Sequence, residues 1–112
     1  MTRGQMGLLQ GTLDVLVLQA LAHESRHGYG VAEWVRRTTD GTLEIEDGAL
    51  YTSLHRMEKR GWLASEWGVS DSNRRAKYYR LTRVGRSELA RASGDWTRYA
   101  EAVSKVLASE GR

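Results

Sequence analysis

The sequence predicts a mainly α-helical fold with a small β-ribbon and one long C-terminal helix, and three observations support this. Apolar residues recur at helical spacing in the stretch that begins at Asp47. Two short segments rich in aromatic and alternating residues follow, joined by a loop of Gly, Ser, Asp and Asn. The stretch Arg83–Ser109 then carries apolar residues at alternating steps of three and four, which predicts a long helix.

The overall composition bounds the class of protein. A chain of 112 residues with 40% hydrophobic content forms one small domain with a modest core. It has no cysteine, which excludes a disulfide framework and thiolate chemistry. The most apolar run, Leu8–Leu21, is interrupted by polar residues and is too short to span a bilayer. Without a visible signal peptide, the sequence is most simply that of a cytoplasmic protein with no membrane partner.

Positive charge is concentrated in one part of the chain. The formal net charge is +3, and the segment from Asp47 to Arg80 holds seven Lys/Arg against four acids, so it contains the whole positive excess. A run of charge is usually only a solvated face. Here it coincides with a predicted helix and hairpin, and this coincidence favours a nucleic-acid partner.

The N-terminal part of the chain is predicted to hold two helices. Met1–Gly7 has the composition of a loose arm, and the length and Leu/Ala/Gln content of Leu8–Ala22 favour a helix buried on most of its surface. A turn is expected at His23–Gly30, followed by a second helix at Tyr29–Thr38 with its arginines outside. The alternating segment Leu43–Ile45 is a candidate short strand that could pair with the ribbon.

His23 and His27 stand four residues apart, a spacing that could present two metal ligands on a helix. Ser25 and Gly28 argue against a helix at this point, and no cysteine or carboxylate pattern completes a metal site. We therefore expect a hydrogen-bonded turn histidine, with no bound metal or cofactor.

The helix predicted from Asp47 has an apolar stripe and a polar outer face. Leu50, Leu54 and Met57 recur at i, i+4 and i+7. Asp47 is a suitable N-terminal cap, and Gly61 follows the last periodic residue as a stop signal. At about 100° per residue, the opposite side carries Gly48, Thr52, His55, Arg56 and Lys59.

Two strands are predicted after this helix, at Trp62–Trp67 and Lys77–Thr82, and the loop between them ends in Arg74–Arg75. A helix with a small polar and basic outer face, followed at once by a hairpin with arginines at its tip, is typical of a winged helix–turn–helix domain. Such a helix can enter the major groove of DNA, while cationic loop tips reach phosphates or the minor groove.

The last predicted helix, Arg83–Ser109, is longer than one small domain can cover. It would run about 40 Å at a rise of roughly 1.5 Å per residue, so a second copy of the chain is the natural partner. Gly94–Asp95 lies inside the pattern and costs roughly 1 kcal/mol of helix propensity, which leaves open a bend or a break there. The predicted seam consists of Leu89, Ala92, Trp96, Tyr99, Val103 and Val106.

Three segments carry a resemblance to a known family: HGYGVAEWV at His27–Val35, DGALYTSLHRMEKRGWL at Asp47–Leu63 and NRRAKYYRLTRVGRSEL at Asn73–Leu89. In this order and spacing they resemble the PadR family of bacterial transcriptional regulators, in its short-tailed branch with a single C-terminal helix. The resemblance implies a winged helix–turn–helix domain over residues 1–82 and a homodimer held by the helix of residues 83–112. It also implies repression of neighbouring genes, relieved in many members by a small aromatic or cationic ligand.

The resemblance further implies which residues meet double-stranded DNA. One departure from the family pattern is Thr52, which follows Leu50–Tyr51 where the family usually has proline. Both residue types tolerate the first turn of a helix, but the threonine hydroxyl can reach a base edge or a phosphate. The residues expected at the major groove and its backbone are Gly48, Tyr51, Thr52, Ser53 and Arg56. Those expected to give phosphate or wing contacts are Lys59, Arg74, Arg75 and Lys77.

Two other functions fit parts of the sequence less well. A winged-helix module that binds protein, or that only dimerises, needs the same apolar pattern. An enzyme needs a nucleophile with its base, a phosphate-cradling loop or a metal cluster, and the sequence has none of these patterns. Trp96 on the seam could form, with its symmetry mate, an aromatic slot for a flat or cationic ligand, although an aromatic residue on a helical stripe is more often plain packing.

Overall fold

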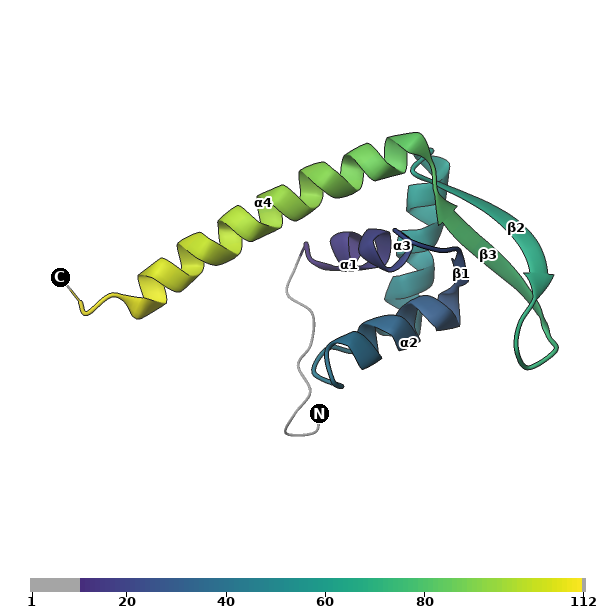
Figure 1. Cartoon of the computed structure of the whole chain (residues 1–112), viewed down its shortest axis with the longest axis horizontal. Coiled ribbons are helices and arrows are strands. Elements are labelled where there is room, and N and C mark those ends of the chain that lie inside the picture. Colours follow the sequence, from purple (N-terminus) through teal and green to yellow (C-terminus); the bar gives the residue numbers. More distant parts are fainter. Residues whose placement is uncertain (1–10, 112) are drawn as a thin grey trace.

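The structure is a computed structural model that describes residues 11–111 (Figure 1). It confirms the predicted winged helix–turn–helix fold with a long C-terminal helix. The expected arm Met1–Gly7, and the first residues of the helix expected at Leu8–Ala22, lie outside the described residues. In chain order the elements are α1 (Leu13–Ala20), β1 (Arg26–His27), α2 (Gly28–Thr38), α3 (Asp47–Lys59), β2 (Leu63–Val69), β3 (Arg75–Leu81) and α4 (Arg83–Ala108).

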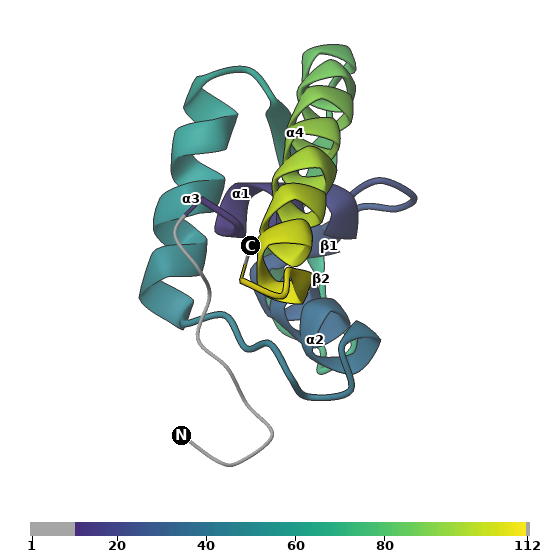
Figure 2. The ribbon, with the colours of Figure 1, turned by 90° about the vertical axis from the view of Figure 1, so that its left-hand side faces the viewer.

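The core lies where α1, α2 and α3 meet the base of the ribbon formed by β2 and β3. Leu18 of α1 and Val31 of α2 are fully buried. The base of the ribbon contributes Leu63 and Leu81 to the same core. The apolar stripe predicted on α3 is its buried face, because Leu50, Leu54 and Met57 are all at most 1% exposed. Figure 2 shows α4 foreshortened, with α3 standing to one side of it.

α3 ends as predicted, but its N-terminal cap differs from the prediction. Gly61 has a φ of 81°, in the left-handed region that glycine adopts without a Cβ penalty. The amide of Trp62 donates to the carbonyl of Met57 at 3.0 Å and closes the helix C-terminus. At the other end Glu46 is the cap and Asp47 is already the first helical residue, so the predicted Asp47 cap is wrong. Asp47 instead places a negative charge in the first turn, where the helix dipole favours it.

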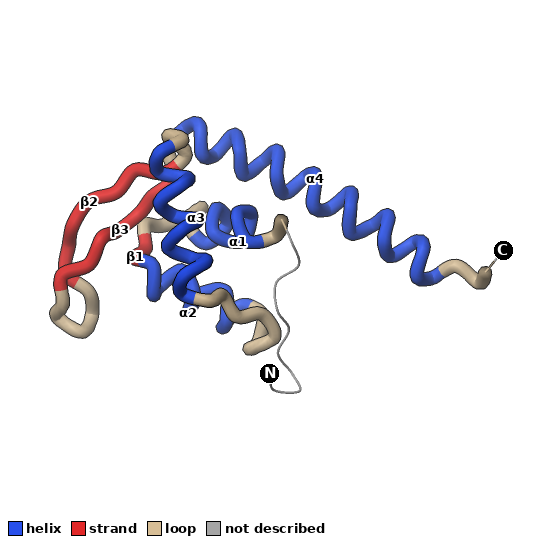
Figure 3. The backbone as a smooth tube through the Cα atoms, turned by 180° about the vertical axis from the view of Figure 1, so that it is seen from behind, coloured by secondary structure: helices blue, strands red, loops and turns tan. Residues whose placement is uncertain are grey.

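Within the described residues, the sheet has three antiparallel strands in the order β1–β3–β2, drawn in red in Figure 3. β2 and β3 are paired along their whole length. The third strand is Arg26–His27, on the other edge of β3. The strand predicted at Leu43–Ile45 is wrong, because only Leu43 forms an isolated bridge. The alternation in that segment arises because Leu43 and Ile45 both turn toward the core from an irregular connection.

His27 is a hydrogen-bonded histidine, as predicted for this turn. Its Nδ1 accepts from the amide of Gly30 at 3.0 Å and thereby caps α2. α2 consequently begins at Gly28, one residue before the predicted start. The segment predicted as a turn, His23–Gly30, therefore contains a short turn, the two residues of β1 and the first turn of α2.

α4 runs unbroken from Arg83 to Ala108, about 39 Å at the usual rise per residue, and extends far beyond the core (Figure 1). Its start is fixed by Thr82, whose Oγ1 accepts from the amide of Gly85 at 3.0 Å. Gly85 lies so close to the connection between α3 and β2 that a Cβ there would be 2.0 Å from the carbonyl oxygen of Trp62. The helix does not break at Gly94–Asp95, and Gly94 is surrounded by open space.

Candidate nucleic-acid interface

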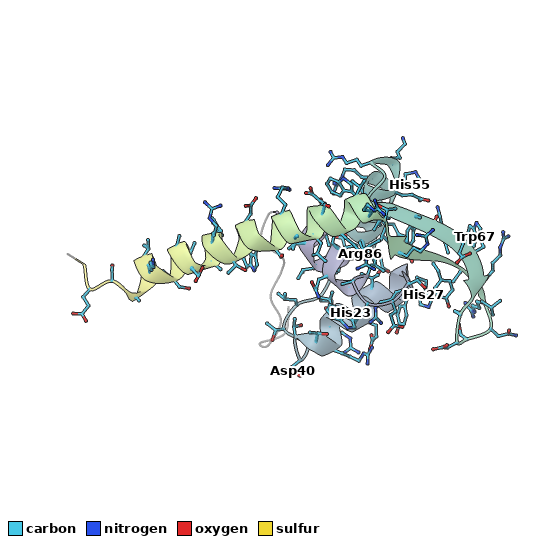
Figure 4. The ribbon with its side chains drawn as sticks, turned by 45° about the horizontal axis from the view of Figure 1, so that its top comes forward. His23, His27, Asp40, His55, Trp67 and Arg86 are labelled. Atoms are coloured by element: carbon cyan, nitrogen blue, oxygen red, sulfur yellow. The ribbon has the colours of Figure 1, made fainter. Side chains whose placement is uncertain are left out.

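The outer face of α3 is open to solvent. Gly48, Thr52, His55 and Lys59 are all exposed, and Tyr51 keeps 51% of its surface. Figure 4 labels His55 among these side chains. Most of them line a shallow groove, and Tyr79 of β3 lines the same groove from the ribbon. α3 therefore presents a polar and cationic strip directly beside the ribbon.

Ser53, predicted at the major groove, is not on this face. Its side chain is 2% exposed, and its Oγ donates to Oδ1 of Asp14 in α1 at 2.7 Å. The helical spacing contains this signal, because a residue three positions after Leu50 lies only about 60° from that stripe residue. We therefore correct the prediction: Ser53 joins α3 to α1 and does not face solvent.

Arg56 is held by the same carboxylate. Its Nη2 lies 2.6 Å from Oδ1 of Asp14, and the two side chains are 38% and 32% exposed. Burial alone would raise the pKa of Asp14, but hydrogen bonds from Arg56 and Ser53 outweigh burial and hold that pKa below its ordinary value. Sequence reasoning missed Asp14 because its partners lie 39 and 42 residues further along the chain. A carboxylate within an apolar helix was the available signal.

The ribbon is tied to α3 through Glu58. This carboxylate accepts hydrogen bonds from Ser65 of β2 at 2.5 Å and from Nζ of Lys77 of β3 at 3.1 Å. The hydrogen bond from Ser65, together with the bond and charge of Lys77, holds the pKa of Glu58 below its ordinary value. Lys77, predicted as a wing contact, is therefore already paired within the chain and fixes the position of the ribbon against α3.

The loop end of the ribbon carries the predicted arginines. Arg74 is exposed in the loop, and the guanidinium of Arg75 lies over the ring of Trp67, 4.4 Å from its centroid. Within residues 11–111 neither arginine forms an ion pair, and the same holds for Lys59 and Arg60 at the end of α3. Four cations beside the α3 face thus remain available for a partner.

The seam predicted on α4 divides into two parts. Leu89 is half-buried and packs against the core of its own chain, and Ala92 is also half-buried. Further along, the seam is exposed to solvent, and the rings of Trp96 and Tyr99 lie 5.9 Å apart. The exposed seam residues are Trp96, Tyr99, Val103 and Val106.

Two negative findings apply to the part of the chain that the structure describes. None of its helices combines the length and apolar character needed to cross a membrane. No group of three or more of its His, Asp and Glu side chains is arranged to hold a metal ion.

Residues 17–91 match the sequence model of the transcriptional regulator PadR-like family. The PadR family transcriptional regulator from Eggerthella lenta DSM 2243 is 33% identical, with a TM-score of 0.74 over 90% of this chain and 86% of that one. A transcriptional regulator from Clostridium thermocellum is 27% identical, with a TM-score of 0.77 over 86% of this chain and 93% of that one. An uncharacterized protein from Lysinibacillus sphaericus is 29% identical over 101 residues, which cover 89% of this chain and 92% of the relative.

Proposed function

The chain belongs to the PadR-like family of transcriptional regulators, and on this basis we propose that it is a sequence-specific DNA-binding repressor that acts as a homodimer. The observation that supports this proposal best is the exposed polar and cationic face of α3, beside a ribbon whose arginines form no ion pair among residues 11–111. Members of this family are generally regulators and not enzymes, and a helix face of this kind is suited to binding.

In this proposal, the N-terminal half of α3 enters the major groove. Tyr51 and Thr52 reach base edges or the adjacent backbone, and Gly48 lets the helix approach closely because it has no side chain. Arg56 reaches DNA in a direction set by Asp14, whose carboxylate already holds one end of its guanidinium. The unpaired cations of α3 and the ribbon contact phosphates. These contacts position the domain on the DNA but do not distinguish one base sequence from another.

The extended α4 suggests that the chain separates DNA binding from dimerisation. We assign DNA binding to residues 1–82 and dimerisation to residues 83–112, with the exposed seam of α4 as the contact between copies. Trp96 and Val103 are each 38% exposed in the single chain, and a second α4 would bury them. Two copies related by a two-fold axis would read an inverted repeat, with half-sites about one helical turn or a multiple apart.

A small-molecule effector belongs to the same proposal. Trp96 and Tyr99 place two rings on the exposed seam, so two copies would bring four rings together near the two-fold axis. A flat aromatic or cationic molecule bound there would release DNA only if it binds one dimer arrangement more tightly than the other. Titrating planar cationic dyes and following tryptophan fluorescence tests this site, with Trp96→Ala as the variant expected to lose the response.

Binding to duplex DNA from upstream of the gene tests the whole proposal. Affinity should fall steeply with salt, because counterion release scales with the number of phosphates contacted. Thr52→Ala should change which bases are preferred. Lys59→Ala, two turns further along the same face, should weaken binding to all DNA sequences alike. A folded dimer that binds no duplex at low salt would contradict DNA binding and favour a protein-binding module with the same fold.

A further inference from the structure

One face of the ribbon continues past the core. Alternate residues of a strand point to the same side of the sheet, and at the base of the ribbon this side is buried at Leu63 and Leu81. Further out, on the same side, Ser65 and Lys77 contact Glu58 of α3. The face thus changes along its length from apolar packing to polar contacts with α3.

Directly opposite Lys77, the same face carries an uncovered tryptophan. Trp67 is 59% exposed and Val69 is 65% exposed, and Figure 4 shows Trp67 out on the ribbon, away from the free end of α4. Arg75 of β3 lies over the Trp67 ring at 4.4 Å. A cation over an indole ring is attracted by the ring quadrupole, so the ring holds the guanidinium in place without neutralising its charge.

Trp67 and Arg75 line one groove together with Tyr51 of α3. Tyr51 is packed over Gly28, where a Cβ would come within 2.7 Å of the tyrosine ring. A glycine at that position therefore lets Tyr51 lie at the edge of the groove. The buried ring of Tyr79 also lines the groove. A predicted DNA-contacting side chain and the exposed ribbon pair thus face the same concave surface.

We propose that Trp67 and Arg75 form one contact unit for the sugar–phosphate backbone of DNA at the edge of the minor groove. This inference rests on the DNA-binding function proposed above. The indole ring packs against a deoxyribose, and the guanidinium held over the ring donates to the adjacent phosphate. Trp67 is therefore both a binding residue and a positioning residue for Arg75, a role that sequence reasoning did not assign to it.

The groove lined by this pair carries more cations than acids, which suits a polyanion: Arg26, Arg37, Arg74, Arg75 and Lys77 against Glu24, Glu33 and Asp71. Arg74 adjoins Arg75 in the chain, and neither forms an ion pair with any residue from 11 to 111. Glu66 points to the opposite side of β2, because it alternates with Trp67. An acidic protein surface would present separate carboxylates, whereas a nucleic-acid strand presents a sugar ring beside each phosphate, which matches an aromatic ring next to a cation.

The test measures binding of the full chain to a labelled duplex several helical turns long at low salt, by fluorescence anisotropy. Trp67→Ala should weaken binding about tenfold, and Trp67→Phe, which keeps a ring, by about threefold or less. Val84→Ala is the control, an exposed apolar side chain at the start of α4 and away from the ribbon face, and should change the Kd by less than about twofold. In the double variant Trp67→Ala/Arg75→Ala, the loss should be smaller than the product of the single losses.

Tryptophan fluorescence provides a second readout that does not depend on lost affinity. DNA should quench the tryptophan fluorescence of the parent protein. The variant Trp67→Phe should lose most of that quenching although it still binds DNA. Equal affinities of the parent and Trp67→Ala, within about twofold, together with an unchanged quench in Trp67→Phe, would overturn this inference and leave the DNA-binding function standing. A parent protein that binds no duplex would instead refute the DNA-binding function itself, and this inference with it.

Discussion

Asp14 connects α1 to α3, and its removal should lower stability by an amount that the structure sets. Asp14→Ala removes the acceptor of two hydrogen bonds, 2.7 Å from Ser53 and 2.6 Å from Arg56. A hydrogen bond to a charged group contributes about 1.5–3 kcal/mol, but the bond from Arg56 contributes less because that side chain is 38% exposed. The hydroxyl of Ser53 would also stay buried without its acceptor. We expect the free energy of unfolding to fall by about 2–3 kcal/mol.

Asp14→Asn is the matched control for this prediction. The amide oxygen can still accept from Ser53, while the charge opposite Arg56 is lost, so we expect a loss of only about 1 kcal/mol. Urea unfolding followed by circular dichroism measures both variants, and their midpoints should fall without a change in the m-value. A loss below about 0.5 kcal/mol for Asp14→Ala, or equal losses for the two variants, would refute this reasoning.

Because of the same carboxylate, the stability of the fold should depend on pH in the acid range. The pKa of Asp14 is held below its ordinary value in the folded chain, so its contribution is complete above the unfolded-state pKa and is lost as the pH falls through the folded-state pKa. Below about pH 4 the parent should therefore lose stability more steeply than Asp14→Asn. If the free energies of unfolding of the two proteins fell in parallel, the pKa of Asp14 would not be lowered by Arg56 and Ser53.

Three further changes test other parts of the structure. Gly85→Ala should destabilise the fold by about 3 kcal/mol, since its Cβ would lie 2.0 Å from a backbone oxygen, whereas Gly94→Ala, which meets nothing within 4 Å, should maintain or raise the thermal midpoint. Val103→Asp should convert a dimer to a monomer in sedimentation and weaken DNA binding with it, and a parent that is already monomeric at micromolar concentration would contradict the seam. Replacing Arg74–Arg75 by alanines should weaken binding to all sequences and lower the salt slope by about one to two, and unchanged affinity would refute the wing assignment.

The main elements could be predicted because their signals are periodic or marked by special residues. α3 shows its buried stripe over several turns, and Gly61 marks its end because the backbone there needs a positive φ. α4 shows its seam in the same way. β1 could not be predicted, because two residues carry no periodic pattern, and the strand Arg26–His27 forms on the free edge of β3. The alternation at Leu43–Ile45 misled for the opposite reason, since Leu43 and Ile45 both contact the core from an irregular connection without forming a strand.

The exposed residues of the candidate site were predictable where helical spacing or a polar loop decides exposure. Thr52 and Lys59 follow from the spacing on α3, which also places Ser53 near the buried stripe, and Arg74–Arg75 follow from the loop between the strands. The tie between Asp14 and Arg56 joins residues far apart in the chain, so no local pattern reveals it. Trp67 is a large aromatic residue that composition would assign to a core, and it is exposed because the ribbon extends past the core.

Hydroxyl-radical footprinting on the DNA upstream of the gene tests most directly whether two copies of the chain bind DNA through α3 and the ribbon. We predict two protected patches related by two-fold symmetry, with centres about one helical turn or a multiple apart. Protection of a single unpaired patch would contradict the dimeric arrangement. No protection at any protein concentration at which the chain is folded would contradict DNA binding itself.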